Sequence, residues 1–222
     1  MQTLLIAHRG DTINHKENTM EAFRSAFKLG ADGIELDIHL ENNELIVVHD
    51  YLFDRSQKYP TLQDVLNEFA GKGRIEIELK VFTDESLPIL KNLLEEYPKL
   101  DCELTSSNLF ILPRVRQVIP SASLGAIFLP KEFEEWMTAE FIERKVREIC
   151  KTLDVNVAHI PANILTPTLV KNIHNQGLKI HSHSYLLSIG IDEEVKEYKK
   201  FCDSGIDQCT FDNINLIAES RK

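Results

Sequence analysis

Long hydrophobic runs are absent from this 222-residue chain, and no stretch approaches the roughly 18 apolar residues that a membrane-spanning helix requires. The apolar segment within residues 1–8 is too short for a signal-peptide core, and no positively charged segment precedes it. Positive charge is also in deficit, because 25 Lys and Arg stand against 35 Asp and Glu. A net charge of −10 disfavours nucleic acid as a partner and disfavours anionic membranes, so any phosphate site must be built locally.

Cysteine is scarce, and its spacing fits neither a disulfide framework nor a zinc site. The four cysteines are Cys102, Cys150, Cys202 and Cys209. We expect reduced thiols in a cytoplasmic protein without stable membrane insertion. No linker or low-complexity segment divides the chain, so we expect residues 1–222 to form one domain.

Short apolar segments alternate with longer amphipathic ones along the whole chain. The predicted strands are Leu4–His8, Gly33–His39, Arg74–Lys80, Asp101–Ser106, Ser123–Leu129, Val155–Ile160, Leu178–Ser184 and Asp207–Asp212. The predicted helices are Asn18–Leu29, Leu62–Phe69, Glu85–Glu96, Leu109–Val118, Lys131–Thr152, Pro167–Asn175, Asp192–Asp203 and Ile214–Ser220. Short apolar strands are typical of parallel sheets covered on both faces. Eight strand–helix units predict a closed (β/α)8 TIM barrel, with a doubly wound open sheet as the alternative.

One segment breaks this alternation. Leu45–His49 has the pattern of a strand, but only residues 40–44 separate it from the preceding strand. A parallel crossover needs about a dozen residues, so this strand is predicted to fold back as a small hairpin with Asn42 and Asn43 in the turn. Asn18, with Glu21 three residues later, predicts a capping box at the start of the first helix.

Polar side chains gather where the predicted strands end, which is the rim that carries the active site in barrels of this kind. Glu35 and Asp37 are two residues apart on one strand, so they share a face, and Glu78 arrives from the next strand. Three converging carboxylates repel one another and are costly to desolvate. Two interpretations stay open: a site for Mg²⁺ or Ca²⁺, or a structural network in which Arg9 and Lys80 pair the carboxylates.

Two histidines, His8 and His49, are predicted to lie at the same rim. One imidazole can accept a proton while the other donates one, and this division of labour suits phosphodiester cleavage. Arg9 and Lys80 are then candidates to hold the non-bridging phosphate oxygens.

Five short motifs follow one another in the first 80 residues: Ala7–Gly10, Glu17–Thr19, Gly30–Asp37, Val47–Asp50 and Ile77–Lys80. Their order and spacing resemble the glycerophosphodiester phosphodiesterase family, and a weaker likeness continues to the last strand. The resemblance implies that His8 and His49 are the general acid and base and that Arg9 and Lys80 lie near the phosphate. It also implies one Mg²⁺ or Ca²⁺ held by Glu35, Asp37 and Glu78. The implied substrate is a small glycerophosphodiester, cleaved to an alcohol and glycerol 3-phosphate.

Three regions depart from the family pattern, and one is the last strand, which reads Thr210–Asn213 where a threonine usually precedes the aspartate and a proline follows soon after. The Tyr51–Pro60 connection is shorter than the family's usual insertion, which predicts an open mouth. His181 and His183 stand where the family commonly has tryptophan and threonine, and we expect them to fill space rather than to contact substrate. The open mouth permits a second reading, lysophospholipase D-like cleavage of a lipid that keeps one acyl chain. A third reading is a catalytically silent barrel that binds a phosphorylated ligand.

Overall fold

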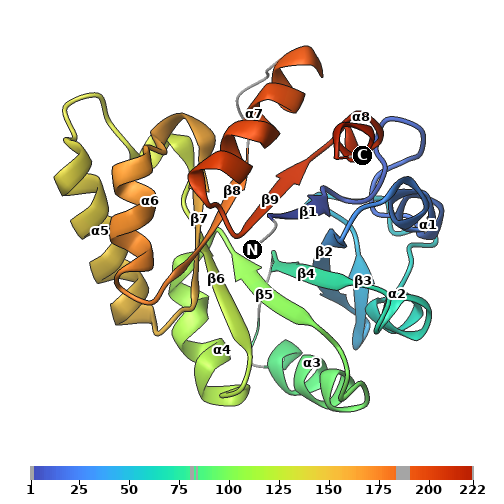
Figure 1. Ribbon diagram of the computed structural model, residues 1–222. Helices are drawn as coiled ribbons and strands as arrows, with labels where there is room; N and C mark the ends of the chain where they lie inside the picture. The colour runs from blue at the N-terminus through green and yellow to red at the C-terminus, as the bar shows by residue number, and fades with distance from the viewer. Residues whose placement is uncertain (1–2, 81–82, 84, 184–190, 222) are drawn as a thin grey trace.

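Eight parallel strands close into a barrel, and the helices lie around its outside (Figure 1). The structure is a computed structural model, and it describes residues 3–80, 83, 85–183 and 191–221. Around the barrel the strands are β1 (Leu4–Ala7), β2 (Gly33–Glu41), β4 (Arg74–Leu79), β5 (Cys102–Ser106), β6 (Ser123–Ile127), β7 (Val157–Pro161), β8 (Lys179–His183) and β9 (Gln208–Phe211). β1 pairs in parallel with both β2 and β9, which closes the sheet. The predicted TIM barrel is therefore confirmed.

A helix follows most strands and packs against the outer face of the sheet. The helices are α1 (Met20–Leu29), α2 (Leu62–Phe69), α3 (Ser86–Glu95), α4 (Leu112–Val118), α5 (Ala139–Leu153), α6 (Pro167–His174), α7 (Ile191–Ser204) and α8 (Ile214–Ser220). Short 3-10 turns follow β5, β6 and β7: η1 (Leu109–Ile111), η2 (Pro130–Glu132) and η3 (Ala162–Ile164). Within the described part of the chain, none of the helices has both the length and the apolar character that a membrane span requires.

The predicted hairpin is present, and the backbone conformation of its turn explains why asparagine occurs there. β3 (Glu44–Val47) pairs antiparallel with the end of β2. Asn42 and Asn43 both have left-handed backbone conformations, with φ of 51° and 63°. Two consecutive left-handed residues form the turn type that suits the twist of a hairpin, and asparagine tolerates this conformation well. The hairpin returns the chain to the carboxyl end of β2 and so brings His49 to the rim.

The first helix begins one residue later than the capping-box prediction. Thr19, not Asn18, is the N-cap, and its side chain accepts a hydrogen bond from the backbone N–H of Ala22. Asn18 has a left-handed backbone (φ 56°), and its amide Nδ2 donates to Asp37 Oδ2 at 2.9 Å. The predicted Asn18 cap was wrong because that side chain bonds a residue far along the chain.

The predicted helix Lys131–Thr152 was too long at its start. Only η2 forms within residues 130–132, and α5 begins at Ala139 after an N-cap at Thr138, whose side chain accepts from the backbone N–H of Phe141. The cap gives the helix a fixed start that the apolar pattern alone did not reveal. Ser184, the predicted last residue of the seventh strand, lies outside the described residues.

Alternation along β2 shows how the barrel separates its two environments. Ile34, Leu36 and Ile38 are fully buried in the hydrophobic core cluster. Glu35 and Asp37, on the opposite face of the strand, are also buried. Because successive side chains on a strand point to opposite faces, the carboxylates face the barrel interior. The core between sheet and helices is apolar, whereas the interior is strongly polar.

Candidate active site

Three carboxylates meet at the mouth of the barrel, where the sequence predicted them. Glu35 and Asp37 come from β2 and Glu78 from β4, and one oxygen atom of each lies within 4.8 Å of the others. Asp37 and Glu78 are direct neighbours in the parallel register of the two strands. This spacing is suited to ligands that share one cation.

Two basic side chains accompany these carboxylates, and we call the five residues together the mouth cluster. Arg9 Nε lies 3.2 Å from Asp37 Oδ2, and Lys80 Nζ lies 3.3 Å from Asp37 Oδ1 and 3.1 Å from Glu78 Oε2. Burial opposes ionisation of Asp37, but the charges of Lys80 and Arg9 outweigh it and lower its pKa. The structure thus brings both predicted phosphate-binding residues against the predicted metal ligands.

The raised pKa of Glu35 indicates that the side chains of Arg9 and Lys80 do not fully balance the charge of the three carboxylates. Burial raises the pKa of Glu35 well above its usual range, and the negative charge of Asp37 raises it further while Arg9 opposes the shift. The backbone N–H of Arg9 donates to Glu35 Oε2 at 3.1 Å. A hard divalent cation prefers carboxylate oxygens and would supply the missing charge, so this donor set fits Mg²⁺ or Ca²⁺.

The loop after β1 fixes Arg9 in place. Arg9 and Gly10 both have positive φ, at 54° and 89°. A Cβ on Gly10 would approach the Ala22 backbone to 2.7 Å, so a side chain at this position would collide with α1. Arg9 Nη1 also donates to Glu17 Oε2 at 2.9 Å. The glycine of this motif therefore allows the close turn that aims the Arg9 backbone at Glu35.

Both predicted catalytic histidines lie at the rim, each beside a carboxylate. His8 Nδ1 is 2.8 Å from Asp212 Oδ1, and His49 Nδ1 is 3.1 Å from Asp50 Oδ1. His8 follows β1 and is 12% exposed, whereas the side chain of His49 is 32% exposed. A carboxylate at Nδ1 favours a proton on that nitrogen and orients the ring. Proton exchange with a substrate would then take place at Nε2.

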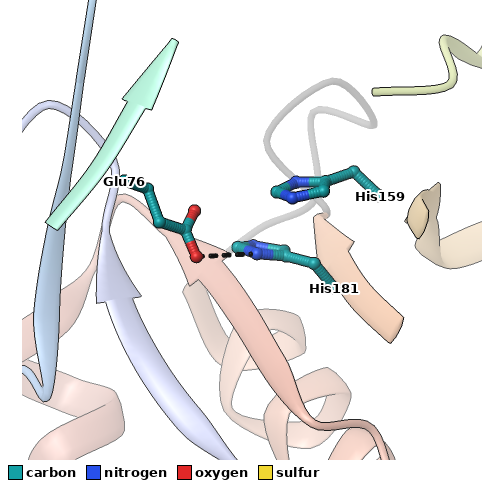
Figure 2. A group of neighbouring side chains, drawn as sticks. All are labelled: Glu76, His159 and His181. Carbon is teal, nitrogen blue, oxygen red and sulfur yellow. Dashed lines mark ion pairs between the residues drawn. The ribbon is translucent and has the colours of Figure 1, made fainter. Parts of the chain in front are cut away.

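A second polar group lies deeper in the barrel, and we call it the interior cluster. It comprises Arg74, Glu76, Glu103, His159, His181 and Gln208, all buried. Figure 2 shows the His159 and His181 rings lying one above the other, with the Glu76 carboxylate directed at His181. His181 Nδ1 is 3.0 Å from Glu76 Oε1, and Gln208 Nε2 donates to both glutamates at 2.9 and 3.1 Å.

One ligand atom each of Glu76, His159 and His181 also lies within 4.8 Å of the others, but the interior cluster is closed by its own hydrogen bonds. The two rings are separated by 4.1 Å between centroids and tilted by 18°. Nitrogen lone pairs of nearly parallel rings do not converge on one ion, and His159 Nε2 instead bonds Glu103 Oε1 at 2.6 Å. Arg74 forms ion pairs with Glu103 and with Asp101. Although its carboxylate and imidazole groups are of metal-binding type, this arrangement favours a structural network.

Several of these partners were not singled out from the sequence. They are Glu103 and Gln208 in the interior, Asp212 beside His8, and Ser107, whose hydroxyl donates to Glu78 Oε1 at 3.1 Å. One signal for Glu103 was available in Gly125 on the neighbouring strand. A Cβ there would lie 2.6 Å from His159 Nε2, so the glycine leaves room for the buried pair. His181 lies in the interior cluster, and His183 is buried two residues nearer the mouth.

Comparison with known proteins gives the family. Residues 8–58 match the Glycerophosphoryl diester phosphodiesterase family. A glycerophosphodiester phosphodiesterase from Caldanaerobacter subterraneus subsp. tengcongensis is 43% identical over 175 residues, which cover 63% of this chain and 72% of that protein. The chain belongs to the glycerophosphodiester phosphodiesterase family. The resemblance seen in its motifs is thereby confirmed.

Solved structures of glycerophosphodiester phosphodiesterases share the fold of this family member. One from Agrobacterium tumefaciens has a TM-score of 0.79 at 20% identity, covering 98% of this chain and 99% of that one. An Oleispira antarctica phosphodiesterase in complex with the product sn-glycerol-3-phosphate has a TM-score of 0.79 at 18% identity, covering 99% and 97%. The fold is therefore that of the family along nearly the whole chain.

Proposed function

We propose that this family member hydrolyses glycerophosphodiesters to an alcohol and glycerol 3-phosphate, with His8 and His49 as general acid and base and one Mg²⁺ or Ca²⁺ as cofactor. The observation that carries the proposal is the mouth cluster, in which three carboxylates converge at the rim that also carries both histidines. The solved neighbour with bound sn-glycerol-3-phosphate supports the proposed product.

Glu35, Asp37 and Glu78 would hold the cation. When bound, a divalent cation neutralises the carboxylates and polarises the phosphoryl oxygens. Arg9 and Lys80 lie within 3.3 Å of the same carboxylates, so a phosphodiester seated beside them would meet two further positive charges. These side chains would bind the non-bridging oxygens and stabilise the negative charge that develops on them.

The two histidines would divide the proton transfers. One imidazole takes the proton of the attacking hydroxyl, which belongs to water or to the glycerol moiety of the substrate. The other gives a proton to the departing alcohol oxygen, which leaves slowly as an alkoxide near neutral pH. Asp212 and Asp50 would hold each ring by its Nδ1 and keep Nε2 directed at the reacting groups.

The short Tyr51–Pro60 connection bounds a hollow of about 240 Å³ beside His49, lined in part by Leu52, Phe53 and Tyr59. We infer that the alcohol group of the substrate lies on this side and that varied alcohols fit. Choline, ethanolamine and glycerol head groups should then give comparable kcat/KM. A preference above about a thousandfold would show that specific contacts read the alcohol.

A substrate panel with released glycerol 3-phosphate as the readout tests the function. The panel is run with and without EDTA, followed by readdition of Mg²⁺ or Ca²⁺. Turnover that EDTA abolishes and the cation restores is the expected result. Binding of glycerol 3-phosphate without turnover of any diester would support a catalytically silent barrel instead. Full activity in a metal-free sample would remove the cation from the proposal.

A further inference from the structure

Each carboxylate of the mouth cluster accepts a hydrogen bond on one of its two oxygens, and we call the three groups that donate these bonds the neutral donors. The bonds run from the Arg9 backbone N–H to Glu35 Oε2 at 3.1 Å, from Asn18 Nδ2 to Asp37 Oδ2 at 2.9 Å, and from the Ser107 hydroxyl to Glu78 Oε1 at 3.1 Å. Two donors come from the loop after β1 and the third from the loop after β5. These loops flank β2 and β4, and from both sides they leave one oxygen of each carboxylate outside these bonds.

The two oxygens of Asp37 differ most clearly. Its Oδ2 lies 3.2 Å from Arg9 Nε in addition to the bond from Asn18. Its Oδ1 is buried and accepts no hydrogen bond within the described part of the chain, although Lys80 Nζ lies 3.3 Å away. Buried polar atoms are nearly always satisfied by hydrogen bonds or by ions. Oδ1 is therefore the oxygen of Asp37 that is suited to a cation.

The ammonium group of Lys80 shows where the remaining oxygens point. Its Nζ lies 3.3 Å from Asp37 Oδ1 and 3.1 Å from Glu78 Oε2. These are the two oxygens that Asn18 and Ser107 do not engage. Oxygens from two neighbouring strands thus converge on one positive charge, while their partners in the same carboxylates are held by the neutral donors.

Asn18 is fixed more firmly than a surface side chain would be. It is buried and has a left-handed backbone, with φ of 56°, and its backbone N–H donates to the Arg9 carbonyl at 3.0 Å. Its side-chain Oδ1 also accepts from the backbone N–H of Asp37 at 3.4 Å. A left-handed backbone is uncommon for a residue other than glycine, although asparagine tolerates it. The loop therefore presents this amide to Asp37 by both of its ends.

The number of oxygens that the carboxylates can offer bears on which cation fits. Ca²⁺ takes about six to eight oxygens and often gains two from one carboxylate, whereas Mg²⁺ takes about six in a strict octahedron and keeps several waters. A carboxylate held by a donor on one oxygen presents the other oxygen end-on. Three such ligands on adjacent strands leave about half of a Mg²⁺ shell for water and substrate, but they fill a smaller part of a Ca²⁺ shell.

We propose that the neutral donors act as positioning groups that limit each of these carboxylates to one ligating oxygen, and that this limit makes the cation site selective for Mg²⁺ over Ca²⁺. The inference rests on the proposed function and narrows its cofactor to one ion. Asn18 and Ser107 act only through Asp37 and Glu78, so their effect is on the choice of cation rather than on the reacting groups.

Calorimetric titration with MgCl₂ and with CaCl₂ tests the preference, and it needs no turnover. In the wild type the Kd for Mg²⁺ should be lower than the Kd for Ca²⁺. Ser107→Ala releases one oxygen of Glu78 and should shift the ratio of the two Kd values toward Ca²⁺ by about tenfold, a usual effect of a bond that supports a metal ligand. Asn18→Gly should give a smaller shift in the same direction, because Arg9 Nε stays beside Asp37 Oδ2.

Matched substitutions away from the mouth provide the controls. Glycine adopts a left-handed backbone without strain, so Asn18→Gly removes the amide and keeps the turn. Asn42→Gly makes the same change at another left-handed asparagine (φ 51°), on the exposed hairpin turn. Ser56→Ala removes a hydroxyl that donates to a carboxylate oxygen of Asp54 at 2.7 Å on an exposed loop. Both controls should keep the wild-type Kd values, and urea unfolding shows that every variant is folded.

The outcomes separate this inference from the function on which it rests. Tighter binding of Ca²⁺ than of Mg²⁺ by the wild type overturns the proposal. So does a loss of the same factor for both cations in the Asn18 and Ser107 variants, because groups that only support the fold would leave the ratio unchanged. If neither cation binds, the cofactor of the proposed function fails together with this inference. If the expected ratios are found but no diester is hydrolysed, the proposed function fails and the selectivity stands.

Discussion

The mouth and interior clusters contain the same kinds of side chains and differ in how the charges of their carboxylates are balanced. Each combines inward-facing carboxylates of neighbouring strands with arginine or lysine, which is buried at Arg74 and half-buried at Arg9 and Lys80. In the interior, Gln208, the stacked rings and Arg74 bind the carboxylates from several sides. At the mouth, three carboxylate oxygens meet within 4.8 Å and two cations stand beside them. The interior carboxylates therefore have partners within the protein, whereas the three carboxylates at the mouth outnumber the two cationic side chains beside them.

Charge balance explains this difference. In the interior, burial opposes ionisation of Glu103, but His159 and Arg74 outweigh it and lower its pKa to about 2, while burial raises the pKa of Glu76 to about 8. One ionised glutamate then faces Arg74, and the second keeps a proton that it can share with His181. At the mouth, burial and the charges of Asp37 and Glu78 likewise raise the pKa of Glu35, but there three carboxylate oxygens lie within 4.8 Å of one another. We expect a proton to neutralise Glu76 in the interior cluster and a divalent cation to balance the carboxylates of the mouth cluster.

The largest expected effect is the loss of activity when either of the two histidines at the rim is replaced. His8→Ala and His49→Ala should each lower kcat/KM by roughly 10²–10⁴, the usual contribution of a positioned acid or base. The double variant should lose much less than the product of the two, because both serve one reaction. In the wild type, kcat/KM should follow a bell-shaped pH profile assigned to the pair. The measurement is steady-state kinetics with glycerol 3-phosphate as readout.

His15→Ala is the control for these variants, since His15 is exposed on the loop after β1. It should keep wild-type kinetics. Binding of the cation should survive all three substitutions, because none of these residues is a proposed ligand. Near-normal turnover in either the His8 or the His49 variant would make that histidine a bystander.

Stability should respond most strongly in the interior. Arg74→Met removes the arginine that pairs with Glu103 and Asp101, which leaves the buried carboxylate of Glu103 with only His159 and Gln208 as partners, and we expect a loss of roughly 3–5 kcal/mol in the free energy of unfolding. Arg9→Met should cost less, because Lys80 remains beside Asp37. Urea unfolding at neutral pH measures both. Equal losses would show that the two clusters are equally dependent on their arginines.

Metal binding should respond only at the mouth. Glu78→Gln keeps the volume of the side chain but removes a ligand charge, so the affinity for Ca²⁺ or Mg²⁺ should fall by at least about tenfold. Glu76→Gln is the matched substitution two residues earlier on the same strand, and it should leave that affinity unchanged. Calorimetric titration of both cations gives the comparison. A weaker site in the Glu76 variant would place the cation in the interior.

The sequence was most informative where local geometry decides the structure. A period of two predicts that Glu35 and Asp37 share the inner face of β2, and the structure places them so. The hairpin followed from a connection too short for a crossover, and Asn42 and Asn43 adopt the expected left-handed conformations. The motifs predicted the family for the same reason, since each is a short segment within or beside the first strands of the barrel.

Contacts between distant segments were the part that sequence could not give. Asn18 had the pattern of a helix cap, but its amide bonds Asp37, 19 residues away. His159 and Glu103 are separated by 56 residues and Gln208 and Glu76 by 132, so no local pattern pairs them.

A last prediction tests the proton in the interior cluster. The pKa of Glu76 is raised to about 8 from an ordinary value of 4.5, so its contribution to stability is fully present below pH 4.5 and is lost as pH rises through 8. The loss is at most about 1.4 kcal/mol per pH unit for one proton. Glu76→Gln keeps an acceptor oxygen for Gln208 but cannot ionise, so its unfolding free energy should fall less than that of the wild type between pH 5 and 8. Glu44→Gln, on the exposed hairpin turn, should follow the wild-type profile. Parallel curves for Glu76→Gln and the wild type would mean that Glu76 is already ionised in the folded protein and that a histidine of the cluster carries the proton instead.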